Sequence, residues 1–173
     1  TYVHNKREFS SVPPITKEYL LSIVVPCYNG EEHLADTIKG LLNLKYNKLK
    51  KIIVVDDCST DNSYEIAKEY EKRYPYKIKV VQTPQNTGCS AGAKNYGAKF
   101  VNTELIGFTD DDSLPEKDSV NYMIGFFDDK EVGAVTSTVL VQNRNNFILR
   151  LQSIEYKVIK FSRKLLEFLD SIY

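Results

Sequence analysis

The sequence has no excess of charge of either sign and no long apolar run. Its 173 residues carry 23 basic and 23 acidic side chains, which is a formal net charge of zero at pH 7. A broad basic field for nucleic acid is therefore lacking, and we expect no nucleic-acid partner. No stretch approaches the roughly 18 consecutive apolar residues that a membrane-spanning helix needs, so we predict no such helix here.

Cysteine is also scarce, and its spacing is not that of a metal site. Cys27, Cys58 and Cys89 are an odd number of thiols, and they lack the paired spacing of zinc ligands. Each follows a predicted strand, so we expect reduced, half-buried thiols near one edge of a sheet, in a reducing compartment. Hydrophobic residues make up 42% of the chain, which is enough for a core and too many for a disordered chain.

Apolar runs alternate with helical patterns along most of the chain. Runs rich in β-branched residues predict strands at residues 20–26, 50–57, 77–83, 104–108 and 132–141. Helical spacing of apolar residues predicts connecting helices at residues 31–44, 59–74, 90–101 and 115–127. This order predicts an α/β fold with a mostly parallel sheet and helices on both faces.

From Phe147 the pattern changes to an apolar stripe that recurs every three or four residues as far as Ile172. The stripe predicts one long amphipathic helix at the C-terminal end. We therefore expect a tether at 1–20, an α/β core at 21–142 and the helical region at 143–173. Because the chain begins with Thr1 rather than Met, we expect it to be a piece of a longer protein.

Polar side chains follow four of the predicted strands, where each strand ends. In open α/β sheets, ligands bind outside the carboxyl ends of the strands. The candidate groups are Tyr28 and Asn29, Asp56 and Asp57, residues 86–90, and Asp110, Asp111 and Asp112. This convergence predicts a ligand site at that edge of the sheet.

Three carboxylates stand in a row at Asp110, Asp111 and Asp112. Each close pair of like charges costs on the order of 4 kcal/mol near a protein surface. Asp110 and Asp112 can share a cation, whereas Asp111 would point elsewhere or cap the next turn. Because Mg²⁺ is commonly held by one or two carboxylates plus substrate phosphates, we predict a metal ion carrying a diphosphate. The alternative is a solvated acidic turn before a helix.

Two other segments suit a nucleotide. Asp56 can accept hydrogen bonds from a nucleobase or ribose, although this segment can instead cap the helix that follows. Lys94 lies one turn into a glycine-rich helix whose N-terminus could face a phosphate, although tight helix packing would explain the glycines equally well. The segment is not a GxGxxG fingerprint, which disfavours a dinucleotide-dependent dehydrogenase.

Four blocks taken together resemble glycosyltransferase family 2 with the GT-A fold. They are SIVVPCYNGEEHLADTIKGLL, IIVVDDCSTDNS, NTGCSAGAKNYGAKF and IGFTDDDSLP, and the resemblance covers residues 21–135. It implies an inverting transferase that moves sugar from a nucleotide-diphosphate sugar, commonly a UDP-sugar, to a saccharide acceptor, with Mg²⁺ or Mn²⁺ as cofactor.

Carried over by position, the resemblance also implies roles for single residues. Those assigned to the nucleotide are Pro26, Tyr28, Glu31, Asp56, Asp57, Lys94 and Asp111. Within this set Asp56 would contact the base, and Asp57 is the second acid of its motif. Asp110 and Asp112 would be the DxD pair that binds the metal. Lys94 stands where the family usually has Arg, which keeps the charge but loses bidentate phosphate recognition.

The block NRNNFILRLQSIEY is similar to processive polysaccharide synthases of the hyaluronan, chitin, cellulose and poly-N-acetylglucosamine types. This similarity implies a catalytic domain at the cytoplasmic face of a membrane. The C-terminal helix would then begin the acceptor-side half, either near the membrane or covering the sheet.

The family's catalytic base lies in a TED-like motif further downstream, and no residue of this chain matches it. We therefore assign no catalytic base, and we expect donor binding with little transfer. Two alternatives remain open, a non-catalytic nucleotide-binding domain and a haloacid-dehalogenase-type phosphatase. The phosphatase places its aspartate pair after the first strand, whereas the pair here follows the fourth.

Overall fold

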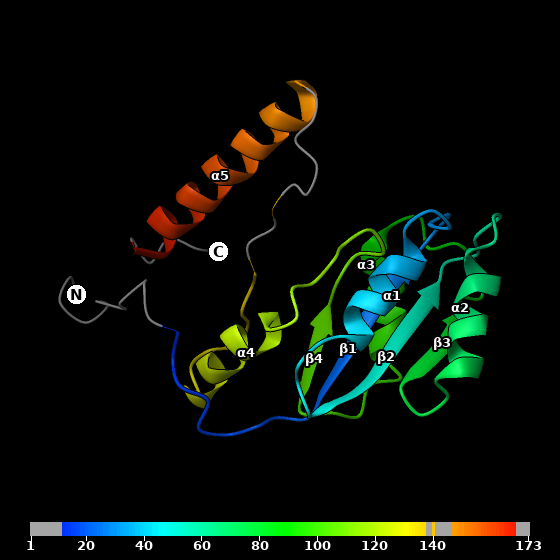
Figure 1. Cartoon of the computed structure of the whole chain (residues 1–173), viewed down its shortest axis with the longest axis horizontal. Coiled ribbons are helices and arrows are strands. Elements are labelled where there is room, and N and C mark those ends of the chain that lie inside the picture. The colour runs from blue at the N-terminus through cyan, green and yellow to red at the C-terminus, as the bar shows by residue number, and fades with distance from the viewer. Residues whose placement is uncertain (1–11, 138–139, 141–146, 169–173) are drawn as a thin grey trace. The chain divides into compact units, whose positions relative to one another are not determined.

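The computed structural model describes residues 12–137, 140 and 147–168. Its centre is a parallel four-stranded sheet in the order β3-β2-β1-β4 (Figure 1). The strands are β1 Leu21–Cys27, β2 Leu49–Asp56, β3 Ile78–Gln82 and β4 Leu105–Phe108. Every end of these four strands lies within one residue of its predicted position.

The strand register brings the carboxyl ends of three strands level with one another. Cys27 is the partner of Asp56 across β1 and β2, and Asp56 is the partner of Gln82 across β2 and β3. The segments that leave these three strands therefore start side by side. β4 ends next to Val24 of β1, and the residues that follow it run along the same edge.

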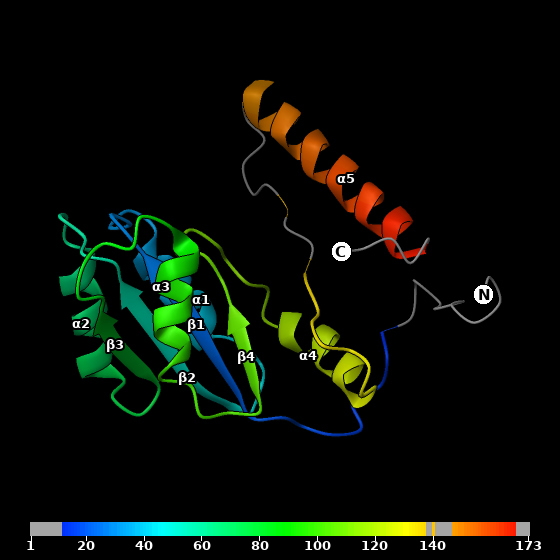
Figure 2. The same ribbon diagram turned by 180° about the vertical axis from the view of Figure 1, so that it is seen from behind.

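Helices cover both faces of the sheet, as predicted. The helices are α1 Leu34–Leu42, α2 Ser63–Arg73, α3 Ser90–Ala98 and α4 Ser119–Ile124, the last followed by the 3₁₀ helix η1 Gly125–Asp128. Figure 1 shows α1 and α2 in front of the strands, and the reverse view in Figure 2 shows α3 across the opposite face.

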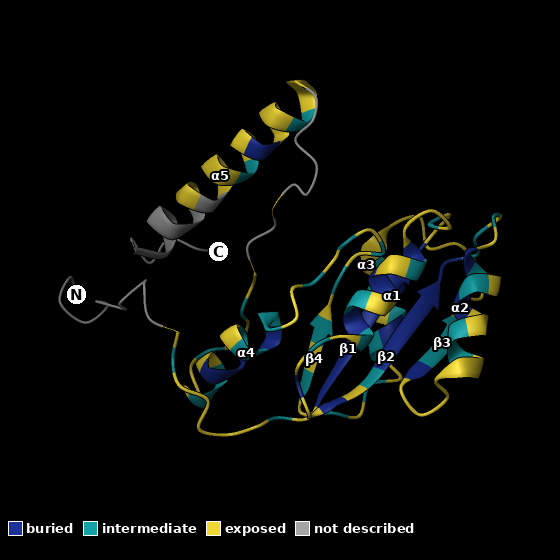
Figure 3. Cartoon of the chain, in the orientation of Figure 1, coloured by how far each residue is buried: buried dark blue, intermediate teal, exposed yellow. Residues whose placement is uncertain are grey.

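The core follows from the alternation of side chains along each strand. Val25 and Val54 pack with Leu34 and Ile38 of α1 on one face, whereas Val24, Ile53 and Val55 pack with Ala93 of α3 on the other. Because both faces are covered, β1 and β2 are buried along most of their length (Figure 3). This explains why they read as continuous apolar runs rather than as alternating ones.

The predicted fifth strand is wrong for the part of it that the structure describes. Residues 132–137 and 140 form no strand, and the rest of the range 132–141 lies outside the described residues. A run of β-branched residues indicates only that a segment suits a sheet. Here β4 pairs with β1 alone among the described strands.

The chain divides into two compact units, one spanning Pro13–Gly133 and one formed by Thr1–Val12 with Ala134–Tyr173. Within the first unit, the segment from Pro13 to Leu20 packs along the η1 region. The hydroxyl of Tyr19 donates to the carbonyl of Phe127 over 3.0 Å, and Lys17 pairs with Glu104 at 2.9 Å. The domain limits at 20/21 and 142/143 stay predictions.

The second unit contains α5 Phe147–Phe168, which confirms the long C-terminal helix over that range. Residues 169–173 lie outside the described part of the chain. The apolar stripe is at least half exposed along its described length, at Phe147, Leu151, Ile154, Val158 and Phe161. No described helix is both long enough and apolar enough to cross a membrane.

Candidate functional site

A cavity of about 560 Å³ opens at the carboxyl end of the sheet. Residues from β1, from the segments after β2, β3 and β4, and from α3 line it together, which confirms the predicted convergence. The lining comprises Pro26, Cys27, Tyr28, Asp57, Asn86, Gly88, Cys89, Ser90, Ala93, Lys94, Asp110, Asp111 and Asp112. Seven of the nine predicted site residues belong to it, and Glu31 and Asp56 do not.

Within the acidic turn, residues 110–112, Asp111 is directed into the protein. Its backbone carbonyl accepts a hydrogen bond of 2.8 Å from the buried hydroxyl of Thr37 on α1. Burial raises the pKa of the Asp111 carboxyl, as do the neighbouring charges of Asp112 and Asp110, while contact with Cys27 lowers it. This arrangement anchors the turn by its middle residue.

The partner of Asp111 on the inner side is Cys27, the last residue of β1. Burial raises the pKa of the Cys27 thiol to about 12, and the adjacent Asp111 carboxyl raises it as well. A thiol with so high a pKa is protonated at neutral pH and is a poor nucleophile. Cys27 therefore serves as a packing and hydrogen-bonding group of the cavity wall.

The other two carboxylates of the acidic turn face different partners. Asp110 Oδ1 lies 2.9 Å from the ammonium of Lys94, and the two side chains are 59% and 29% exposed. The described contact of the exposed Asp112 is a weak one of 3.5 Å with the hydroxyl of Ser113. Lys94 is thus the cation opposite the acidic turn, and Asp112 retains oxygen atoms for a ligand.

Asp57 organises the segment that connects β3 to α3. Its buried carboxylate accepts hydrogen bonds from the Thr83 hydroxyl at 2.7 Å and the Thr87 hydroxyl at 2.8 Å, and from the Thr87 amide at 3.0 and 3.1 Å. Burial raises the pKa of Asp57, but these hydrogen bonds outweigh it and the net pKa lies below its usual value. Asn86 adds a bond of 2.9 Å to the Asp57 carbonyl.

Asp56 lies deeper than Asp57, at only 1% exposure. Its Oδ2 accepts from the side-chain amide of Gln82 at 2.8 Å and from the Ser59 amide at 3.3 Å. Its Oδ1 is buried without a hydrogen-bond partner among the described residues. The structure thus places Asp57, and not Asp56, on the cavity wall.

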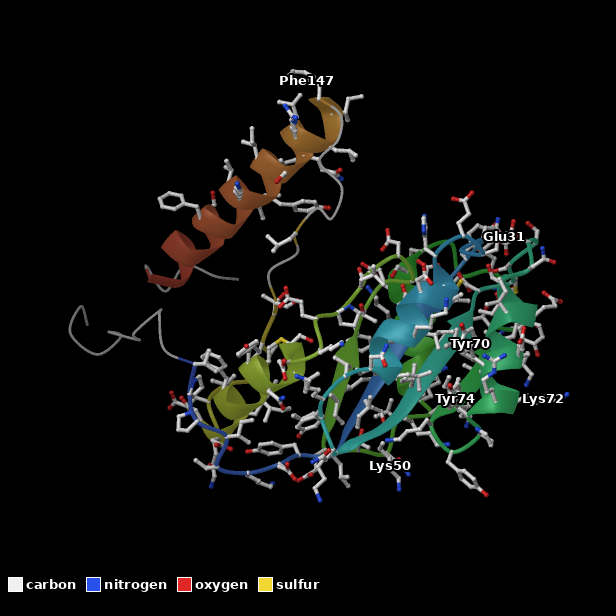
Figure 4. All side chains as sticks on the ribbon, in the orientation of Figure 1. Glu31, Lys50, Tyr70, Lys72, Tyr74 and Phe147 are labelled. Atoms are coloured by element: carbon white, nitrogen blue, oxygen red, sulfur yellow. The ribbon has the colours of Figure 1, made fainter. Side chains whose placement is uncertain are left out.

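Glu31 is engaged outside the cavity. Its Oε2 accepts from the backbone amide of Asn62 at 3.0 Å and from the Asn62 side chain at 2.9 Å, at the start of α2. Figure 4 shows Glu31 at the carboxyl end of the sheet, whereas Lys50 lies at the opposite end. Tyr28 lines the cavity and is 53% exposed.

Two residues that line the cavity, Cys27 and Ala93, belong to no motif that the sequence analysis identified as a site. Cys27 was expected only as a half-buried thiol, and Ala93 was given no role. Ala93 is buried against the sheet and still borders the cavity. Strand register and helix placement decide such positions, and neither is visible in a local pattern.

The acidic turn fits a hard divalent cation that brings further ligands with it. Among the described residues no group of three acidic, histidine or cysteine side chains could hold a metal by itself. Mg²⁺, however, is typically held by one or two carboxylates together with substrate phosphates. Asp112 is available as such a metal ligand, and Asp110 becomes available once it separates from Lys94.

The fold and the cavity define an α/β protein with a phosphate- and metal-compatible site at the strand ends. The family model for glycosyl transferase family 2 matches residues 22–172. The chain belongs to this family, which confirms both the resemblance and the GT-A fold.

Curated relatives point to polysaccharide synthases. The chain is 34% identical over 137 residues to poly-β-1,6-N-acetyl-D-glucosamine synthase from Staphylococcus epidermidis, and 34% identical over 143 residues to the same enzyme from Staphylococcus aureus strain COL. In both comparisons 79% of this chain is covered, but only 32% of the relative. The chain therefore spans about a third of the length of these relatives.

Solved structures of glycosyltransferases are similar as well. A mannosyltransferase from Pyrobaculum calidifontis, in complex with GDP-mannose and Mn²⁺, is 26% identical and matches with a TM-score of 0.69 over 78% of this chain and 39% of its own. A Staphylococcus aureus TarS fragment in complex with UDP-GlcNAc is 25% identical, with a TM-score of 0.57 over 71% of this chain and 38% of its own.

Proposed function

We propose that this chain forms the donor-binding part of an inverting glycosyltransferase that transfers sugar from a UDP-sugar to a saccharide acceptor. The observation that carries the proposal is the cavity in which Asp57, Lys94 and the acidic turn converge from separate elements. The acceptor is inferred from the polysaccharide synthases among the relatives. A position at the cytoplasmic face of a membrane remains an expectation from the resemblance.

In this proposal the acidic turn and Lys94 hold the diphosphate end of the donor. Asp112 and Asp110 would hold Mg²⁺ or Mn²⁺, and Lys94 would contact the phosphates as a point charge. When bound, the metal would stabilise the negative charge that develops on the departing diphosphate. The mannosyltransferase complex with Mn²⁺ supports a divalent cation in a related site.

The nucleoside end would lie against the residues at the ends of β1 and β2. Tyr28 offers an exposed ring for stacking, and Pro26 adds apolar surface beside it. The base contact implied for Asp56 fits its Oδ1, which has no hydrogen-bond partner among the described residues, whereas both oxygens of Asp57 accept from Thr83 and Thr87. Gln82 and Ser59 would hold the Asp56 carboxylate by its other oxygen.

Isothermal titration calorimetry with UDP and Mn²⁺ tests the proposal. We expect UDP to bind in the presence of Mn²⁺ and Asp112→Asn to weaken that binding at least about tenfold, because a metal ligand is lost. The matched control is Asp36→Asn, which removes an exposed carboxylate from α1 outside the cavity. UDP affinity that Mn²⁺ does not increase, or hydrolysis of a simple aryl phosphate without UDP binding, would contradict the proposal.

A further inference from the structure

Lys94 and Asp110, which both line the cavity, form an ion pair with each other. The Lys94 ammonium donates to Asp110 Oδ1 over 2.9 Å. The proposed function gives each of them a different partner, the diphosphate for Lys94 and the metal ion for Asp110. While the ion pair is intact, Asp110 shields Lys94 from an incoming phosphate, and the ammonium occupies one carboxylate oxygen that a metal would use.

We propose, on the basis of that function, that the Lys94–Asp110 ion pair couples metal binding to diphosphate binding. Within the pair, each side chain occupies the position of the other's ligand. Either ligand alone must separate the pair and leave one of its charges without a partner. A metal ion and a diphosphate arriving together replace both halves of the pair at once. The two ligands therefore bind with positive cooperativity, and each favours the other by the same factor.

The surroundings make this pair specific to Asp110. Asp111 is held inward by Thr37 and borders Cys27, and Asp112 forms no ion pair among the described residues. Lys94 therefore holds one of three adjacent carboxylates. Removing Asp110 and removing Asp112 change the charge of the cavity equally, but only the first releases Lys94.

The pair is also suited to opening. Asp110 is 59% exposed, and ion pairs of such exposure are weak enough for a ligand to displace. Lys is a compact charge on a flexible stem, whereas a bidentate Arg would hold a carboxylate in a fixed geometry. The Lys at position 94 can thus change partners by rotating its side chain.

Metal-free calorimetry separates this coupling from simple charge effects. With EDTA present, we expect Asp110→Asn to raise the affinity for UDP about three- to fivefold, the range that an exposed ion pair contributes. Asp112→Asn should raise it clearly less, because it removes an equal charge from the cavity but leaves the Lys94–Asp110 pair intact. The double variant Lys94→Met/Asp110→Asn should not show the rise in UDP affinity expected for Asp110→Asn, because it lacks the ammonium that the single variant releases.

The reciprocal experiment titrates Mn²⁺ alone. Lys94→Met should raise Mn²⁺ affinity about three- to fivefold by releasing Asp110. Lys45→Met, which removes the exposed Lys45–Asp118 pair outside the cavity, should leave Mn²⁺ affinity unchanged. Equal gains in the two aspartate variants, or no gain in Asp110→Asn, would overturn the coupling. If the wild type did not bind UDP even with Mn²⁺ present, the proposed function itself would instead be overturned.

Discussion

At Gly30 the absence of a side chain allows Asp111 to take its inward position. A Cβ at this residue would lie 2.2 Å from Asp111 Oδ2 and 3.0 Å from Cys27 Sγ. We predict that Gly30→Ala displaces the Asp111 carboxylate, which moves the acidic turn. The expected loss of unfolding free energy is about 1–3 kcal/mol, as for other overpacked sites, together with weaker Mn²⁺-dependent UDP binding. Urea denaturation and calorimetry measure the two effects.

The matched control for this substitution is Gly133→Ala, because a Cβ at Gly133 would have no neighbour within 4 Å. We expect its stability to stay within about 0.5 kcal/mol of the wild type. If Gly30→Ala behaved like this control in both measurements, close packing against Gly30 would not be what positions Asp111.

Asp57 gives a prediction on acid stability. Hydrogen bonds from Thr83 and Thr87 outweigh burial and leave the folded-state pKa of Asp57 below its usual value. A depressed carboxyl pKa stabilises the fold above the unfolded-state pKa of about 3.9, and the stabilisation is lost as the pH falls through the folded-state pKa. We expect Asp57→Asn to cost about 1–3 kcal/mol at pH 7, and less below pH 4.

Urea unfolding of both proteins at pH 7 and pH 3 checks this prediction. Asp36→Asn is the control, since the pKa of Asp36 is also lowered, by its exposed partner Lys39. Exposed pairs contribute little, so this variant should show a smaller difference at pH 7. A stability gap between wild type and Asp57→Asn that is the same at both pH values would contradict the linkage.

At the scale of elements, the closeness of α3 to the sheet determines where Lys94 lies. A Cβ at Gly97 would come within 2.6 Å of both Val24 Cγ1 and Val55 Cγ2. We predict that Gly97→Ala forces α3 away from the sheet and costs about 1–3 kcal/mol of unfolding free energy, despite the better helix propensity of Ala. Because α3 carries Lys94, UDP binding with Mn²⁺ should weaken as well.

Asn95→Ala on the exposed side of the same helix is the matched substitution. It should stabilise α3 slightly, by about half a kcal/mol, because Ala is the better helix former. Thermal denaturation and calorimetry compare the two variants. A neutral Gly97→Ala would show that α3 tolerates a larger separation from β1 and β2.

Elements with strong local patterns were the predictable part of this fold. β1 and β2 contain the apolar β-branched runs 23–25 and 52–55, so their positions followed from the sequence. The described part of the fifth strand, residues 132–137 and 140, was wrong because a strand needs a partner that a β-branched run does not specify. Asp56 and Asp57 are adjacent, and only strand geometry decides which of them faces the cavity.

At the scale of the whole molecule, the unit Pro13–Gly133 contains every residue that lines the cavity. We predict that a fragment spanning residues 13–133 folds cooperatively and binds UDP with Mn²⁺ within about threefold of the full chain, a difference of less than 1 kcal/mol. Circular dichroism during thermal denaturation and calorimetry measure the two properties. Failure to fold, or loss of binding, would place part of the site outside this unit.

A shorter fragment, 21–133, tests where that unit begins. It lacks the hydrogen bonds of Tyr19 to Phe127 and Asp128, and the pairing of Lys17 and the Leu20 amide with Glu104. At about 1 kcal/mol for each hydrogen bond, we expect a loss of at least about 2 kcal/mol relative to 13–133. Equal stability of the two fragments would instead support a domain limit at residue 20/21, with the preceding segment acting only as a tether.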